Sequence, residues 1–194
     1  MTVYLGCNFL SMRSYFILCF LLFIISAPAF TQEFGGNPPS VKWQQVNTPE
    51  ARVIFPRGLD TAAQHIAGIV QYLNRHTGAT AGTAQRKINI VLQNQTTLAN
   101  GYVGLAPWRS EFFLTPQFNS FQLGSLPWVD NLAIHEYRHV QQYMNYRKGL
   151  SKLAYIILGE EGQAIANSAA IPNWFFEGDA VFQETAVSGQ GRGR

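Results

Sequence analysis

Residues 135–139 read HEYRH, and residues 174–180 read WFFEGDA. Side chains four positions apart on an α-helix lie on the same side, so His135 and His139 can direct their ring nitrogens at one ion. Zinc accepts histidine and carboxylate ligands, and a zinc ion that acts on a substrate is held by three protein ligands and a water. The first segment therefore supplies two candidate ligands, and Glu177 of the second segment is the best placed third.

The sequence around HEYRH has the periodicity of an amphipathic helix. Its apolar side chains recur at steps of three and four residues and form one stripe, which consists of Val129, Ala133, Tyr137, Val140 and Met144. The histidines lie roughly opposite this stripe, beside Asn131, Arg138 and Gln142. We expect the helix to bury its apolar side in a core and to turn both histidines toward a polar cleft.

Three further acidic side chains can be assigned from their positions. Glu136 follows the first histidine and can lie beside a water held by the ion, where it would act as general base. A second helix is expected after Pro172, which suits a first turn. On it, Glu184 shares the face of Glu177 and is a candidate to hydrogen-bond a ligand histidine, with a solvated charge as the equal alternative. Asp179 points away from Glu177, so we leave it out of the ligand set.

Both segments resemble helices of the gluzincin metallopeptidases, the clan that contains thermolysin and the zinc aminopeptidases. The second is similar to the WLxEGxA…E helix of the aminopeptidase branch, in which the glutamate before glycine binds zinc. The resemblance covers roughly residues 85–186. It implies one zinc ion, with Glu136 as the general base. The ligands that it implies are His135, His139 and Glu177.

The resemblance also implies an α+β, zincin-like fold. In such a fold a small mixed sheet with an amino-terminal helix precedes the HExxH helix, and a mostly helical carboxy-terminal part follows. The sequence departs from the family in three respects: the interval between His139 and Glu177 is much longer, no Gly-x-Met-Glu-Asn segment is present, and few residues follow Glu177. The side chain that stabilises the oxyanion in this clan lies beyond the third ligand. We therefore expect an incomplete catalytic domain and further domains of a longer polypeptide.

Alternating and helical patterns predict the remaining elements. Strands are expected at residues 41–46, 52–55, 87–92, 100–105 and 111–115. A helix is expected at 59–77, with a buried side formed by Ala63, Ile66, Ala67, Val70 and Leu73.

Two helices, 150–158 and 163–169, are expected between the motifs, broken near Gly159 and Gly162. They could wall the cleft or act as a lid. Their larger side chains are expected to serve packing alone, and these are Leu153, Tyr155, Ile156 and Ile157.

One predicted strand is a candidate to bind substrate. In the gluzincins an edge strand above the zinc pairs with the substrate backbone by β-augmentation. Asn100, Gly101 and Tyr102 are the candidates here, because glycines in this segment would let another chain approach closely. An ordinary, loosely packed strand is an equally good interpretation.

Residues 1–31 have the organisation of a secretory signal peptide. Arg13 precedes an apolar run at 15–25, which small residues at 26–29 follow. An uncleaved anchor is the alternative, and the start is either Met1 or Met12. We expect a bacterial protein that is secreted or held in the periplasm or cell envelope. Residues 32–40 are then a flexible lead-in, 41–186 the zincin-like domain and 187–194 a Gly/Arg tail.

The composition limits the classes of binding partner that we expect. The net charge is +3 and the charged fraction is 13%, without a basic stripe of the kind that binds nucleic acid. Once the signal peptide is removed, no membrane-spanning segment is expected. The sequence thus predicts a secreted zinc metallopeptidase that acts on a peptide or protein. The alternative is a non-catalytic cell-surface binding module, or a degenerate zincin with a structural metal.

Overall fold

The computed structural model describes residues 36–118 and 124–193. The chain divides into two units, Met1–Gly36 and Asn37–Arg194, and the description below concerns the second. The expected signal peptide and residues 32–35 of the expected lead-in lie outside the described residues.

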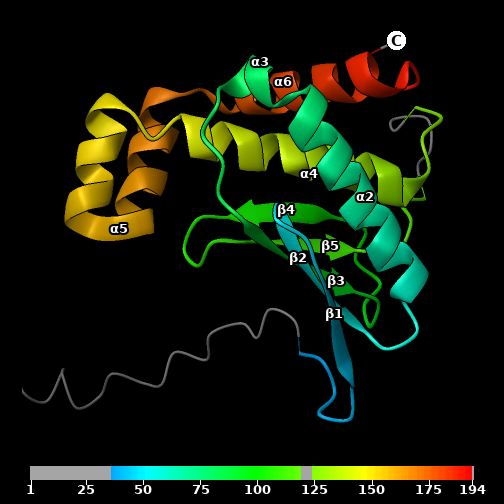
Figure 1. Cartoon of the computed structure of the whole chain (residues 1–194). Helices are drawn as coiled ribbons and strands as arrows, with labels where there is room; N and C mark the ends of the chain where they lie inside the picture. Colours follow the sequence, from blue (N-terminus) through cyan, green and yellow to red (C-terminus); the bar gives the residue numbers. More distant parts are fainter. Residues whose placement is uncertain (1–35, 119–123, 194) are drawn as a thin grey trace, which may run out of the picture. The chain divides into compact units, whose positions relative to one another are not determined.

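A five-stranded mixed sheet forms one layer of this unit (Figure 1). Its strands are β1 (Trp43–Asn47), β2 (Ala51–Pro56), β3 (Ile88–Gln93), β4 (Gly101–Gly104) and β5 (Arg109–Phe113). Their order across the sheet is β1-β2-β3-β5-β4. The three inner strands are parallel, and β1 and β4 pair antiparallel at the two edges. The mixed sheet that the sequence predicts is confirmed, with β4 as an edge strand.

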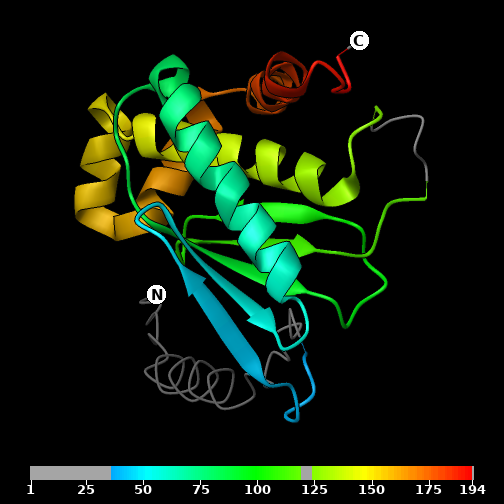
Figure 2. The same cartoon turned by 45° about the vertical axis from the view of Figure 1, so that its right-hand side comes forward.

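The helices gather on one side of the sheet. They are α2 (Asp60–His76), the one-turn α3 (Gly78–Ala81), α4 (Trp128–Asn145), α5 (Gly149–Ala170) and α6 (Asn173–Ser188). Helices α2 and α4 lie over the sheet, and α6 lies along the far side of α4, so that α4 is enclosed between two layers (Figures 1 and 2). This is an α+β architecture, as expected.

The core lies between the sheet and the helices. Strands β2 and β3 alternate between buried and more exposed residues, as a sheet with one covered face requires. All five residues predicted for the buried side of α2 are buried there. The apolar stripe of α4 joins the same core through Ala133, Tyr137, Val140 and Met144.

Both histidines of α4 border a cleft, as predicted. Helix α6 also covers this polar side of α4, where Asn131, Arg138 and Gln142 are buried as deeply as the apolar stripe. Burial of such groups is tolerated only when they are hydrogen-bonded or paired. The partners on α6 therefore determine how this face is arranged.

Helix α5 is a hairpin of two helical arms that reverses at Gly159, where φ is 67°. The break predicted near this glycine is confirmed, and the positive φ explains why a glycine stands there. The prediction that the larger side chains serve packing alone is wrong for three of them: Leu153 is 53% exposed, Ile156 69% and Ile157 69%. The two arms of the hairpin contact each other through smaller side chains instead. Among the described residues, no helix is both long and apolar enough to cross a membrane.

A matched pair of leucines tests the location of the core. Leu73→Ala should lower the free energy of unfolding by roughly 2–5 kcal/mol, because it opens a cavity where the side chain is only 1% exposed. Leu98→Ala makes the same chemical change at a side chain that is 59% exposed, and should change stability by less than about 0.5 kcal/mol. Urea unfolding followed by circular dichroism measures both. Equal losses would show that α2 does not pack as described.

Candidate metal centre

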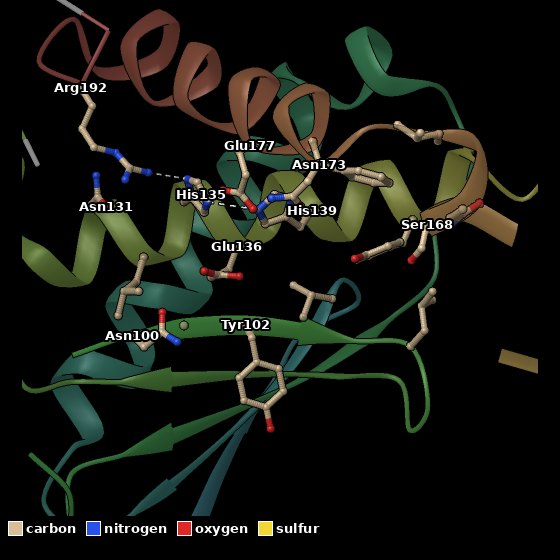
Figure 3. A pocket seen from close by; sticks show the side chains of 18 of the residues that line it. Asn100, Tyr102, Asn131, His135, Glu136, His139, Ser168, Asn173, Glu177 and Arg192 are labelled. Carbon is tan, nitrogen blue, oxygen red and sulfur yellow. Dashed lines mark hydrogen bonds and ion pairs between the residues drawn. The ribbon is translucent and has the colours of Figure 1, made fainter. Parts of the chain in front are cut away.

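Three side chains from α4 and α6 form a group that could hold a metal ion, namely His135, His139 and Glu177. The two Nε2 atoms are 3.1 Å apart. Glu177 places Oε2 at 3.2 Å from Nε2 of His135 and Oε1 at 3.7 Å from Nε2 of His139. Both histidines are buried and the Glu177 side chain is half exposed. One turn of α4 and one turn of α6 thus bring all three predicted ligands together (Figure 3).

The other ring nitrogen of His135 is held from behind. Glu184, fully buried on α6, accepts a hydrogen bond from Nδ1 of His135 at 2.5 Å. The same carboxylate accepts from the side-chain amide of Asn131 at 3.1 Å. Glu184 therefore lies where the sequence predicted support for a ligand histidine, two turns beyond Glu177.

Arg192 reaches the same carboxylate from the end of the chain. Its guanidinium donates to Glu184 through Nε at 2.8 Å and through Nη2 at 2.5 Å. Nη2 also lies 2.8 Å from Nδ1 of His135, but a ring nitrogen that donates its proton to Glu184 cannot accept one from arginine. Residues 189–193 of the predicted Gly/Arg tail pack back on α6, which itself continues to Ser188.

His139 is oriented by an amide, which sequence reasoning overlooked. Its Nδ1 donates to Oε1 of Gln142 at 2.8 Å. The amide nitrogen of Gln142 donates to Asp179 Oδ2 at 2.7 Å, which fixes the amide orientation. Asp179 in turn accepts two hydrogen bonds from Arg138, at 2.7 and 2.9 Å. Asp179 thus lies outside the ligand group, as predicted, and acts through Gln142. The signal was present in the sequence, since Gln142 is one turn from His139.

The charges of the group are strongly coupled. Burial disfavours the imidazolium of His135, yet hydrogen bonds to Glu177 and Glu184 outweigh it and raise its pKa to about 9. Burial, and then the charge of His135, lower the pKa of His139. The hydrogen bond from His135 lowers the pKa of Glu177. The raised pKa of His135 therefore favours its imidazolium, which can donate hydrogen bonds to both Glu177 and Glu184.

Glu136 faces a different side of α4, toward the edge strand β4. Burial raises its pKa to about 7. A carboxyl group with a pKa near neutral can both accept and release a proton at neutral pH. A Cβ atom at Gly101 would lie 2.8 Å from both Oε1 of Glu136 and Cδ2 of Leu132, so a larger residue there would require these side chains to shift. The approach of a substrate chain to this glycine stays a prediction.

A cleft of about 640 Å³ joins these parts. Its lining includes the two histidines, Glu136, Glu177 and Arg192, together with Ala99 to Val103. Asn100, Gly101 and Tyr102 thus all border the cleft, but the Tyr102 side chain points away from the histidines (Figure 3) and its hydroxyl accepts a hydrogen bond from Arg109. From Tyr102, only the backbone is available to the cleft. The second arm of α5 forms another wall, so this insert borders the cleft.

No family model, no curated protein and no solved structure matches this chain. The chemistry of the site therefore has to be argued from its own residues.

The contact between Gln142 and His139 can be tested through metal affinity. Gln142→Leu removes the acceptor for Nδ1 and should weaken binding of a divalent metal ion by about 10–100-fold, because outer hydrogen bonds fix the tautomer of a ligand histidine. Titration against a chromophoric chelator measures the affinity, and circular dichroism confirms folding. Gln85→Leu is the control, since Gln85 is exposed. An unchanged affinity in folded Gln142→Leu would remove this glutamine from the site.

Proposed function

We propose that this chain is a secreted zinc metallopeptidase of the gluzincin type, in which Glu136 is the general base. One observation carries the proposal: two buried histidine nitrogens and a carboxylate converge in the cleft that also holds Glu136. Secretion rests on the signal peptide expected at residues 1–31. The zincin-like character of the fold belongs to the same proposal, and the mixed sheet followed by the HExxH helix supports it.

The separations within the group suit zinc. Ligand atoms held tetrahedrally by zinc at roughly 2.0–2.1 Å lie about 3.3 Å from one another. The observed separations are 3.1 Å between the two Nε2 atoms, 3.2 Å between His135 and Glu177, and 3.7 Å between His139 and Glu177. Both Nδ1 atoms are already engaged, so each Nε2 is directed at the common centre. A site made of nitrogen and carboxylate donors favours zinc over magnesium or calcium. Zinc binding would replace the proton on His135.

When bound, a zinc ion supplies a Lewis acid and a water of lowered pKa. Glu136 lines the same cleft as the histidines and would accept a proton from the attacking water, whose oxygen would add to the scissile carbonyl carbon. As the C–N bond breaks, Glu136 passes this proton to the leaving amine nitrogen. The position of its pKa near neutrality suits both transfers.

The position of β4 supports a polypeptide substrate. It pairs only with β5 among the described strands, so its other edge keeps backbone groups free beside the cleft. An extended peptide can add to such an edge by backbone hydrogen bonds. The peptide would then lie beside the part of the cleft that holds Glu136, because Gly101 and Glu136 both line it.

Replacement of the general base is the decisive test. Glu136→Gln should retain zinc and lose cleavage of an unfolded protein such as casein by at least about 100-fold, as expected when a general base is removed. Metal analysis and a fluorogenic casein assay measure the two properties, in the chain from residue 32 and in any longer natural form. Glu161→Gln, an exposed glutamate on α5, is the control.

The outcomes separate the alternatives. Zinc bound without Glu136-dependent cleavage in any form would leave a structural metal or a binding module. Absence of zinc binding would reject both the enzyme and the structural metal.

Gly101 tests the approach of β4 to the general base. Gly101→Ala would place a Cβ 2.8 Å from both Glu136 Oε1 and Leu132 Cδ2, so the carboxylate must shift. We expect kcat to fall by on the order of 100-fold, because catalysis tolerates little displacement of a reacting group, with zinc content unchanged. Gly104→Ala is the matched control on the same strand, since its Cβ would meet nothing nearer than 3.4 Å. Equal activity of the two variants would contradict this arrangement.

A further inference from the structure

The first arm of α5 carries an unusual amount of exposed apolar surface. Five of its large aliphatic side chains are more than half exposed: Leu150 (75%), Leu153 (53%), Ile156 (69%), Ile157 (69%) and Leu158 (61%). The hairpin lies at the margin of the helical layer, away from α2 (Figures 1 and 2). A contiguous apolar surface of this kind marks an interaction site more often than isolated exposed side chains do.

The two arms of the hairpin contact each other through small and polar side chains, while the large apolar side chains of the first arm face outward. Ser151 donates a hydrogen bond to Asn167 at 2.8 Å between the arms, and both residues are buried. Gly162 lies so close to the first arm that a Cβ there would meet the carbonyl oxygen of Ala154 at 2.2 Å. Helices in water bury their large apolar side chains between them, whereas helices in lipid pack through small and polar residues. The hairpin follows the second pattern.

The charges of the first arm and of the two residues before it are all positive. Arg147, Lys148 and Lys152 precede or interrupt the aliphatic residues, and no acidic residue occurs between Arg147 and Gly159. Arg147 is held with its guanidinium 4.4 Å from the ring centre of Tyr155. Past the reversal, Glu160 is neutralised by Arg86 at 2.5 Å, and Glu161 is exposed. Basic residues beside an apolar helix face are complementary to anionic lipid headgroups.

We propose that the outer face of the first α5 arm docks onto an anionic membrane surface. The arm is about 15 Å long at the rise of an α-helix, roughly half the thickness of the hydrocarbon core. It therefore lies in the interfacial region, with the aliphatic side chains among the acyl chains and Lys148 and Lys152 at the headgroups. This is the binding mode of interfacial amphipathic helices.

Docking would also bring the cleft near the membrane. The second arm of the same hairpin lines the cleft through Ala164, Asn167 and Ser168. The hairpin thus joins the lipid-facing surface to the wall of the candidate metal centre. The substrate class that follows is a polypeptide segment held at a membrane surface. This consequence rests on the proposed peptidase function, whereas docking itself does not.

Vesicle binding tests the proposal with the chain from residue 32, which contains the whole compact unit. Co-sedimentation is compared between vesicles of phosphatidylcholine alone and vesicles that also contain phosphatidylglycerol. We expect binding to the anionic vesicles to be at least about tenfold stronger and to weaken as salt is raised. Lys152→Gln should reduce it about fivefold, the contribution of one basic residue at an anionic surface.

Two variants distinguish vesicle binding through the apolar face from non-specific adsorption. Leu153→Asp combined with Ile157→Asp should abolish vesicle binding, because both side chains belong to the lipid-facing stripe. Leu98→Asp, at an exposed leucine outside the hairpin, should leave it unchanged. Glu136→Gln should also bind normally, so failure of the peptidase proposal would not affect this result.

Three results would contradict docking to an anionic membrane. Absence of binding to anionic vesicles overturns it, as does binding that the double variant retains. A concentration-dependent dimer, detected by light scattering and lost in the double variant, would assign this face to a second copy of the chain. Circular dichroism of the variants confirms that each is folded.

Discussion

The arrangement of this molecule depends on the burial of a polar helix face. The side of α4 that carries both histidines is covered by α6, and a buried polar or charged group is costly unless it is paired. Each carboxylate of α6 meets a partner on α4: Glu177 and Glu184 contact His135, and Asp179 contacts Arg138. Charge pairing therefore orients α6 on α4, together with the apolar contacts of the buried Phe176 and Ala180.

The same pairing prepares the candidate metal centre before any ion binds. Glu184 and Gln142 hold the two Nδ1 atoms, so neither ring can rotate without loss of a buried hydrogen bond. Glu184 would add a further negative charge beside Glu136 and Glu177, and Arg192 compensates it through two hydrogen bonds. These hydrogen bonds replace the hydration that the buried groups lose, which stabilises the fold. The same hydrogen bonds orient the candidate ligands.

Local periodicity explains what the sequence could predict. The buried side of α2, the apolar stripe of α4 and the reversal at Gly159 all follow from patterns within one element. Contacts between elements have no such pattern. The link from Asp179 through Gln142 to His139 and the return of Arg192 to Glu184 depend on how α6 lies across α4. The aliphatic residues of α5 were misjudged for the same reason, since periodicity cannot tell a core from another apolar environment.

The long interval between His139 and Glu177 need not displace the third ligand. A helical hairpin returns the chain to its starting point, so its length adds little to the distance between its ends. Helix α5 reverses at Gly159, and its arms are tied by the contact of Ser151 with Asn167. Asn173 therefore begins α6 close enough to α4 for Glu177 to reach both histidines. The insertion lengthens the sequence between the two motifs while the geometry of the ligand group is retained, and it adds a wall to the cleft.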